Sequence, residues 1–475
     1  MPASPGVVHL DALGPGGPYR AQAREVVTDV TGRPVAELSM VPRLYVRRAL
    51  TALKRARTLS ADERTAALAE AGRLFATATL GGLSVEAYEH AVARVSGLPV
   101  TMVREATATT AAGMAGAYGS AGQARPRGSR DTSHGAGRAV WIRRADVLAV
   151  VTAGNHPGIH VQWVEALALG YRLAVRPSRR EPLTAHRLVT ALHEAGFGTD
   201  HVVLLPTDHG VADDLVDGAD LAMVYGGEDV IAKYRADATV LPHGPGRAKI
   251  LVTADTDATG HLDTIVDSIS RQAGAACVNA TAVFVEGDPA PVAEAIAGRL
   301  AALPSLPPQD DRAVLPVRQV DAARTLDKYL RSEAAGARAW LGGETVVDEL
   351  GDGSAALRPA VFQLDRADAP QTRLEMPFPC VWVAPWTRAD GLAPLRDTVV
   401  LTALTSDGEL VEELLDEPAI RSLHVGDHPT HVLVPGLPHD GYLGEFLMRG
   451  KTFTPPSAPA AAATAPATAT AGPGR

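Results

Sequence analysis

The chain has 475 residues, of which 46% are hydrophobic and 21% are charged, a balance typical of folded globular proteins rather than disordered or fibrous ones. At about 100 to 200 residues per domain, this length predicts two or three domains. The formal charge of -9 is spread along the chain without a long basic run, which argues against nucleic acid as a partner.

The two ends of the chain have the composition of loose extensions. Residues 1–17 are rich in Pro and Gly, and the Pro/Ala-rich tail at 454–475 has too few large apolar side chains to bury a core. We expect both ends to be disordered and the tail to be dispensable for activity. Neither a secretory signal nor a membrane-spanning segment is visible, so we expect a cytoplasmic protein without a membrane partner.

The first folded part of the chain is predicted to be helical. Apolar residues recur at helical spacing over residues 42–117, and Ser60 with Glu63 forms a plausible capping box ahead of them. The Gly-rich segment 119–137 then interrupts the pattern and indicates a loop or a domain boundary.

A regular alternation of short apolar runs and amphipathic runs follows. It predicts strands at 147–152, 173–176, 202–205 and 221–225, with helices at 160–169 and 182–195. Strands that alternate with crossover helices indicate an α/β fold with a doubly wound parallel sheet, which binds ligands beyond the carboxyl ends of its strands. A second α/β unit is expected over 249–430. The chain has no Gly-x-Gly-x-x-Gly, so a dinucleotide would not be held in the usual Rossmann manner.

Four segments, read together, resemble the aldehyde dehydrogenase superfamily over about 45–453. The segments are Ala-Gly-Asn-His-Pro-Gly at 153–158, Arg-Pro-Ser at 176–178, the stretch 271–286 around Cys277, and the stretch 375–383 that begins with Glu375. Their order and spacing match the superfamily together, which is more specific than any one of them. The resemblance implies an aldehyde dehydrogenase-like fold, with a cofactor domain that faces a second α/β catalytic domain.

The resemblance also implies roles for individual residues. Cys277 is the expected nucleophile, which forms a covalent thioester, and the side chain of Asn155 together with the Cys277 amide would stabilise the oxyanion. The expected cofactor-binding residues are Arg176, Pro177 and Ser178 at the adenosine ribose and Glu375 at the nicotinamide ribose. Gly226 and Gly227 form at least a tight turn, and their lack of side chains permits a close approach to phosphate.

Each of these residues also has a plainer interpretation. Cys277 alone, in an Ala-rich segment, reads as a small buried hydrophobic residue, Asn155 reads as turn chemistry, and Glu375 reads as a surface residue. Cys380 is interpreted as structural, because it leads into an apolar strand. Neither Cys belongs to a Cys-x-x-Cys pair and the histidines lack metal-site spacing, so no metal is expected.

The segment that matches the superfamily's Glu-Leu-Gly-Gly motif determines the expected reaction. Here it reads Leu-Pro-His-Gly-Pro-Gly from Leu241, without the carboxylate that activates water to hydrolyse the acyl-enzyme. Together with Gly154, which replaces an aromatic residue, this makes the chain look closest to acyl-CoA reductases of the bioluminescence type and of antibiotic pathways. We therefore expect NAD(P)H-dependent reduction of an acyl thioester or acyl adenylate to an aldehyde.

Two alternatives stay open. The first is an oxidative aldehyde dehydrogenase whose base lies elsewhere; Glu165 is one candidate, and the sequence does not place His243 near the site. The second is a member of the superfamily without catalytic activity, which binds a nucleotide or a partner.

The cofactor and assembly are expected as follows. Arg176, with Arg179 and Arg180 close behind, could clamp a 2′-phosphate, which favours NADPH, with NADH possible. Residues 18–248 would form the N-terminal helices and cofactor domain, with 119–144 as a possible oligomerisation hairpin. The segment 431–453 would be a C-terminal oligomerisation strand. The resemblance implies a homodimer or homotetramer that acts on a small-molecule or carrier-bound acyl substrate.

Overall fold

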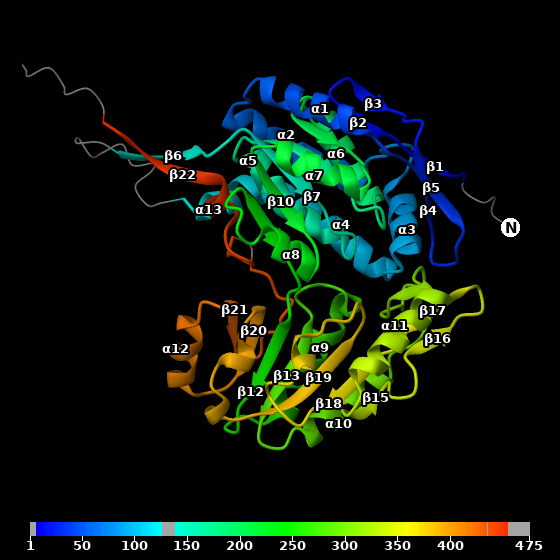
Figure 1. Ribbon diagram of the computed structural model, residues 1–475, viewed down its shortest axis with the longest axis vertical. Helices are drawn as coiled ribbons and strands as arrows, with labels where there is room; N and C mark the ends of the chain where they lie inside the picture. The colour runs from blue at the N-terminus through cyan, green and yellow to red at the C-terminus, as the bar shows by residue number, and fades with distance from the viewer. Residues whose placement is uncertain (1–5, 126–137, 435, 455–475) are drawn as a thin grey trace, which may run out of the picture.

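A computed structural model describes residues 6–125, 138–434 and 436–454 of the chain. The chain folds into two α/β units, one built from the N-terminal half and one from the C-terminal half (Figure 1). After the second unit, the chain returns to the first unit (orange to red in Figure 1) and ends in a strand that projects away from both.

The first unit is built on a seven-stranded sheet with the order β11-β10-β7-β8-β9-β2-β3. Five of its strands are parallel, and β2 and β3 add an antiparallel hairpin at one edge. The strand bounds are β2 Ala12–Gly14, β3 Gly17–Tyr19, β7 Val147–Val151, β8 Arg172–Arg176, β9 Val202–Leu204, β10 Leu221–Tyr225 and β11 Val240–His243. The sheet confirms the predicted doubly wound fold.

Helices cover both faces of this sheet. Leu148 and Val150 of β7 point into a core shared with α2 to α6, whereas Val147 and Ala149 point into a second core shared with α1 and α7. Both faces are thus buried, which explains why the strands are continuous apolar runs. The helix bounds are α1 Arg43–Arg55, α2 Ala61–Thr77, α3 Val85–Ser96, α4 Val100–Gln123, α5 His160–Ala168, α6 Leu183–Glu194, α7 His209–Gly218 and α8 Glu228–Tyr234.

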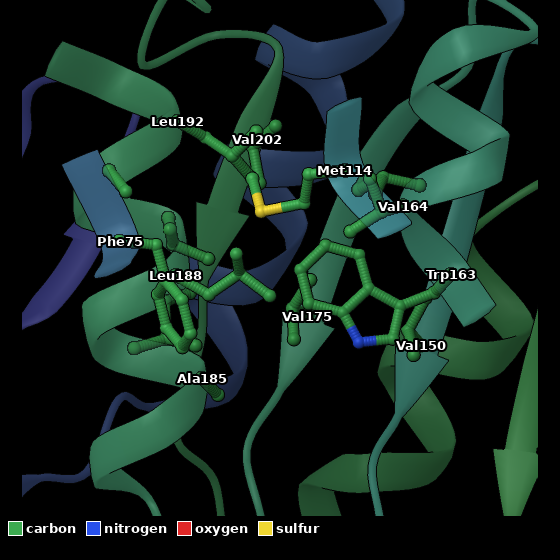
Figure 2. Packing of buried hydrophobic residues seen from close by; sticks show 14 of the residues in the cluster. Phe75, Met114, Val150, Trp163, Val164, Val175, Ala185, Leu188, Leu192 and Val202 are labelled. Carbon is green, nitrogen blue, oxygen red and sulfur yellow. The ribbon is translucent and has the colours of Figure 1, made fainter. Parts of the chain in front are cut away.

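Figure 2 shows the larger of these two cores from close by. Trp163 of α5 lies beside Val150 and Val175, while Leu188 and Leu192 of α6 pack towards β9. All five side chains are fully buried. Burial of large apolar side chains of this kind contributes about 1.5 to 3 kcal/mol each, so this core fixes α5 and α6 against the strands that they connect.

The second unit contains another seven-stranded sheet, with the order β15-β18-β19-β13-β12-β20-β21. All of its strands are parallel except β15 at the edge. The strand bounds are β12 Ala248–Val252, β13 Ala280–Glu286, β15 Arg338–Leu341, β18 Ala360–Gln363, β19 Cys380–Trp386, β20 Thr398–Leu404 and β21 Ile420–Val425. The helix bounds are α9 Leu262–Ser270, α10 Ala290–Ala301, α11 Val320–Glu333 and α12 Gly408–Asp416.

Three small sheets complete the fold. One joins β1, β5 and β4, one joins β14, β17 and β16, and one pairs β22 with β6 in an antiparallel arm that projects from the body (Figure 1). Their bounds are β1 Val8–Leu10, β4 Arg24–Thr28, β5 Pro34–Ser39, β6 Arg138–Arg143, β14 Val317–Gln319, β16 Val347–Glu349, β17 Ser354–Leu357 and β22 Met448–Phe453. The arm thus joins parts of the two segments suspected of oligomerisation.

Most of the predicted elements are present, including the capping box, in which Ser60 Oγ accepts from the Glu63 amide over 3.2 Å. The expectation of a disordered arm at 1–17 is wrong for its described part. Leu10 and Leu13 are buried there, and the Gly and Pro residues form the tight turn between β2 and β3. The predicted break at 119–137 begins too early, because α4 continues to Gln123. Residues 126–137 and the tail after Thr454 lie outside the described residues. Within the described ranges, no helix has both the length and the hydropathy to span a bilayer.

A buried histidine makes the stability of the first unit depend on pH. His160 at the start of α5 is 1% exposed, and its Nδ1 accepts a hydrogen bond of 3.1 Å from Trp163 Nε1. Burial, together with neighbouring His156, lowers the pKa of His160 from 6.5 to about 3. Because the unfolded chain binds this proton below pH 6.5 and the folded chain does not until about pH 3, acidification within that window favours unfolding.

We predict that His160→Asn, whose amide oxygen can replace Nδ1 as the acceptor, is less stable than the wild type at pH 7. The difference in the free energy of unfolding should shrink by about 2 kcal/mol at pH 5, because only the wild type then loses stability through this group. Urea denaturation of both proteins at the two pH values measures it. A difference that does not change between pH 7 and pH 5 would contradict the assignment.

Candidate active site

A cavity of about 1080 Å³ lies between the two units, at the carboxyl ends of β7, β8, β10 and β11. It brings together residues from four distant parts of the sequence. All but one of the predicted site residues line it, namely Asn155, Arg176, Ser178, Gly226, Gly227, Cys277 and Glu375. Pro177 does not: it is buried after β8. Cys380 and Glu165 also lie outside its lining.

Cys277 lies in a short loop between α9 and β13. A turn with strained backbone angles precedes it. Gln272 and Ala273 have φ of 54° and 58°, a left-handed conformation that non-Gly residues rarely adopt. Gly274, with φ of 62°, follows, and a Cβ there would lie 2.3 Å from Pro379 N. The turn is therefore packed tightly against the segment that carries Glu375.

Asn279 fastens this loop, and the sequence analysis did not identify it. Its Oδ1 accepts from the Ala276 amide over 2.9 Å, and its Nδ2 donates to the carbonyls of Ser268 at 3.1 Å and Arg271 at 2.7 Å. The side chain is 3% exposed. One buried side-chain amide thus connects the end of α9 to the residue before Cys277. The sequence shows only an Asn ahead of a strand and does not indicate this role.

Asn155 reaches across from the first unit to the same loop. Its Nδ2 donates to the Ala275 carbonyl over 3.1 Å, and an amide nitrogen carries a second N–H that this bond does not use. The structure explains why the preceding residue, Gly154, is a glycine: a Cβ there would lie 2.2 Å from Ser178 Oγ. An aromatic side chain at residue 154 would not fit in this arrangement.

Cys277 is half-buried in the wall of the cavity. Burial raises its pKa to about 12, and the negative charges of Glu375 and Asp440 act in the same direction. Glu375 is held in place by the Arg247 amide, which donates to its Oε1 over 2.7 Å. Since only a thiolate is a good nucleophile, the chemistry at Cys277 requires a group that takes its proton.

His243 lies in this cavity with a carboxylate partner. Its Nδ1 is 3.1 Å from Asp440 Oδ2, and its ring stacks on Tyr225 with centroids 4.8 Å apart. Its Nε2 is buried and has no hydrogen-bond partner in the part of the chain that the structure describes. An imidazole that is oriented by a carboxylate on one nitrogen and free on the other has the arrangement of a general base.

The segment that carries His243 passes the loop of Cys277, and both residues line the same cavity. A Cβ at Gly246 would lie 1.9 Å from the Cys277 carbonyl oxygen, so the segment that carries His243 runs directly past Cys277. The sequence analysis found no carboxylate in this segment and could not place His243. The structure brings it to the site.

His439 and Asp440 were missed because the segment 431–453 was taken as an oligomerisation strand. Only Met448–Phe453 forms a strand, and Leu443–Leu447 is a short helix, α13. The part before α13 enters the cavity, where His439 Nε2 lies 3.9 Å from Cys277 Sγ. Asp440 also pairs with Arg421 at 3.2 Å.

The arginines after β8 differ from the expected arrangement. Arg176 is 4% exposed, and its guanidinium donates to Thr207 through Nε and Nη2, at 3.1 Å and 3.0 Å. It is therefore a structural support rather than the expected clamp for a 2′-phosphate. Arg179 pairs with Glu25 at 2.9 Å, and Arg180 is exposed at the rim; both line the cavity.

Comparison with known proteins shows the family of this chain. Residues 20–392 match the profile of the aldehyde dehydrogenase family, and the chain belongs to that family. The predicted class of enzyme, an NAD(P)-dependent oxidoreductase of the aldehyde dehydrogenase type, is thereby confirmed. Among the described residues, no group of three or more His, Cys, Asp or Glu side chains is arranged to hold a metal ion.

The chain is similar to curated proteins that are named malonate-semialdehyde dehydrogenase. It is 26% identical to the protein from Bacillus cereus over 247 residues, which cover 49% of each chain. It is 27% identical to malonate-semialdehyde dehydrogenase 2 from Bacillus mycoides over 164 residues, which cover 32% of this chain and 33% of that one. The matches thus span between a third and a half of these relatives. Their names do not support the finer resemblance to acyl-CoA reductases.

Solved structures share the whole fold. Aldehyde dehydrogenase 21 from Physcomitrella patens, in complex with the reaction product succinate, has a TM-score of 0.81 at 16% identity and covers 95% of this chain and 99% of its own. NAD-dependent aldehyde dehydrogenase from Sinorhizobium meliloti has a TM-score of 0.80 at 18% identity, with coverages of 94% and 95%. These likenesses confirm the predicted aldehyde dehydrogenase-like fold.

The close passage of Gly246 under Cys277 gives a prediction. Gly246→Ala should lower kcat/KM about 100-fold or more, because its methyl group must displace the Cys277 carbonyl, and shifts of about 1 Å at a reacting group have costs of this order. Gly260→Ala, where a Cβ meets no atom within 4 Å, is the matched control and should change little. Unchanged activity in Gly246→Ala would show that the loop position does not matter for catalysis.

Proposed function

We propose that this enzyme oxidises an aldehyde to a carboxylic acid with NAD(P)+, through a thioester on Cys277. The observation that carries the proposal is the His243–Asp440 pair in the cavity of Cys277, with Nε2 of His243 free to accept a proton. Reduction of an activated acyl group was expected because the matching segment lacks a carboxylate. If His243 is the base, the missing carboxylate no longer argues against oxidation. The names of the relatives also favour oxidation.

The cavity suits an NAD(P) cofactor. Its volume of about 1080 Å³ is at the upper end for small-molecule sites, and a Cβ at Gly227 would meet no atom within 4 Å, so the wall there is open. Gly226 and Gly227 would lie along the cofactor, Ser178 and Arg179 near its adenosine ribose, and Glu375 near its nicotinamide ribose. When bound, the oxidised cofactor supplies the hydride acceptor.

The residues of the chain would act in the following order. Sγ of Cys277 gives up its proton and bonds to the aldehyde carbon, and the free N–H of Asn155 together with the Cys277 amide stabilises the oxyanion. The C–H bond of this adduct would then break as its hydride leaves for the bound oxidised cofactor, and the oxyanion re-forms a carbonyl, which gives the thioester. Once the thioester has formed, Nε2 of His243 takes a proton from water as the water oxygen attacks the acyl carbon, and Asp440 stabilises the resulting imidazolium. The carbon–sulfur bond then breaks, which releases the acid and restores Cys277.

The direction of the reaction is tested with two sets of substrates. Aldehydes, with malonate semialdehyde among them, are supplied with NADP+ or NAD+, and acyl thioesters and acyl adenylates are supplied with NADPH. We expect acid formation in the first set and little aldehyde formation in the second, followed by absorbance and by mass spectrometry of the products. Rapid formation of aldehyde from an acyl thioester, without oxidation of any aldehyde, would overturn the proposal.

His243 gives a prediction for the steady state. His243→Gln should lower kcat for aldehyde oxidation by about 100-fold or more, the usual contribution of a general base, because water then attacks the thioester unaided. Asp440→Asn should act in the same direction with a smaller effect. His90→Gln on α3 is a control outside the cavity. If kcat for His243→Gln equals that of the wild type, the base lies elsewhere.

We also propose that NADP(H) is preferred to NAD(H), with Arg179 and Arg180 rather than Arg176 at the 2′-phosphate. A charge-assisted hydrogen bond contributes about 1.5 to 3 kcal/mol. The double variant Arg179→Gln/Arg180→Gln should therefore lose about tenfold or more in kcat/KM for NADP+ and change little for NAD+. Equal kcat/KM values for the two cofactors in the wild type would contradict the preference.

A further inference from the structure

The thiol of Cys277 contacts a histidine from the returning C-terminal segment. His439 lies between β21 and α13, and its Nε2 is 3.9 Å from Cys277 Sγ, within the range of a contact between a thiol and an imidazole. It is a different histidine from His243, which pairs with Asp440. Consecutive residues of one segment therefore reach the nucleophile and the imidazole that we assign to water activation.

The surroundings of His439 leave its imidazole free to react. Its Nδ1 is buried and has no hydrogen-bond partner among the described residues, while its carbonyl oxygen is fixed by Ser422 Oγ at 3.1 Å. Its backbone is thus held in place, and Cys277 is the side chain that its Nε2 contacts.

The charges around His439 favour a neutral ring at rest. Burial lowers its pKa from the ordinary value of 6.5, the charge of Asp440 acts in the opposite direction, and His243 and His424 lower it further. A neutral imidazole is a proton acceptor. Asp440 beside it would stabilise the imidazolium once the proton has moved.

We propose that His439 is a further catalytic residue, which accepts the proton of Cys277 when the sulfur attacks. The Sγ–H bond breaks, the proton binds to Nε2 of His439, and the freed electron pair of the sulfur bonds to the electrophilic carbon. When the thioester is later cleaved, the departing thiolate takes the same proton back. His439 thus serves the thiol and His243 serves the water.

This inference rests on the proposed function only in that Cys277 is the nucleophile. The test therefore uses the free enzyme, without aldehyde or cofactor. The rate at which iodoacetamide alkylates Cys277 is followed by peptide mass spectrometry from pH 6 to 10 in the wild type, His439→Gln and His439→Ala, with buried Cys380 as the internal reference. His428→Gln, an exposed histidine of the same segment, is the matched control.

We expect alkylation of Cys277 at pH 7.5 to be about 100-fold slower in both His439 variants and unchanged in His428→Gln, since loss of a general base has costs of this order. The rate in the variants should rise only at higher pH, where the thiol ionises unaided. Free imidazole should restore part of the rate in His439→Ala, which a purely structural role for His439 would not produce.

Melting temperatures show whether each variant is folded. If His439→Ala does not fold, the comparison of His439→Gln with the wild type decides the test. Alkylation rates in folded His439 variants that stay within about twofold of the wild type, or a lack of response to imidazole, would overturn the proposal. If the enzyme fails to oxidise aldehydes while alkylation still depends on His439, the proposed function falls and this inference stands.

Discussion

The poor solvation of the Cys277 thiol is the constraint on which the site depends. In a desolvated pocket beside Glu375 and Asp440, the thiol keeps its proton, and its pKa is raised to about 12. In the proposed mechanism, the attacking sulfur and the attacking water therefore each need a proton acceptor at the right place. Two half-buried imidazoles line the cavity, His439 against Sγ and His243 with Asp440 behind it, and we propose that they are these two acceptors.

These groups come together only because three parts of the fold meet. The first unit supplies Asn155 and, at the end of β11, His243; the second unit supplies the loop of Cys277 and the segment of Glu375. The chain that returns from β21 supplies the remaining partners before it forms α13 and the β6–β22 arm. A change in the path of this returning segment would therefore disturb Cys277 and His243, the proposed nucleophile and the proposed base, although neither belongs to it.

Much of the fold and part of the site could be predicted from the sequence. The alternation of apolar strands and helices is a local signal that can be read from the sequence. The motifs around Asn155, Cys277 and Glu375 pointed to a shared site, and these three residues line one cavity. The role of Arg176 could not be predicted, because it depends on the contact with Thr207, and a residue's type does not show which of its neighbours it binds. The proposed role of His243 was missed because its partner, Asp440, lies about 200 residues further along the chain.

The measurement that tests this account most directly is the identity of the species on the enzyme during turnover. His243→Gln and the wild type are mixed with aldehyde and NADP+, quenched within the first turnovers and analysed by intact and peptide mass spectrometry. The account predicts that an acyl adduct accumulates on Cys277 in the variant, while the wild type holds little of it because water removes the acyl group. An adduct on another residue, or equal adduct levels in the two proteins, would contradict it.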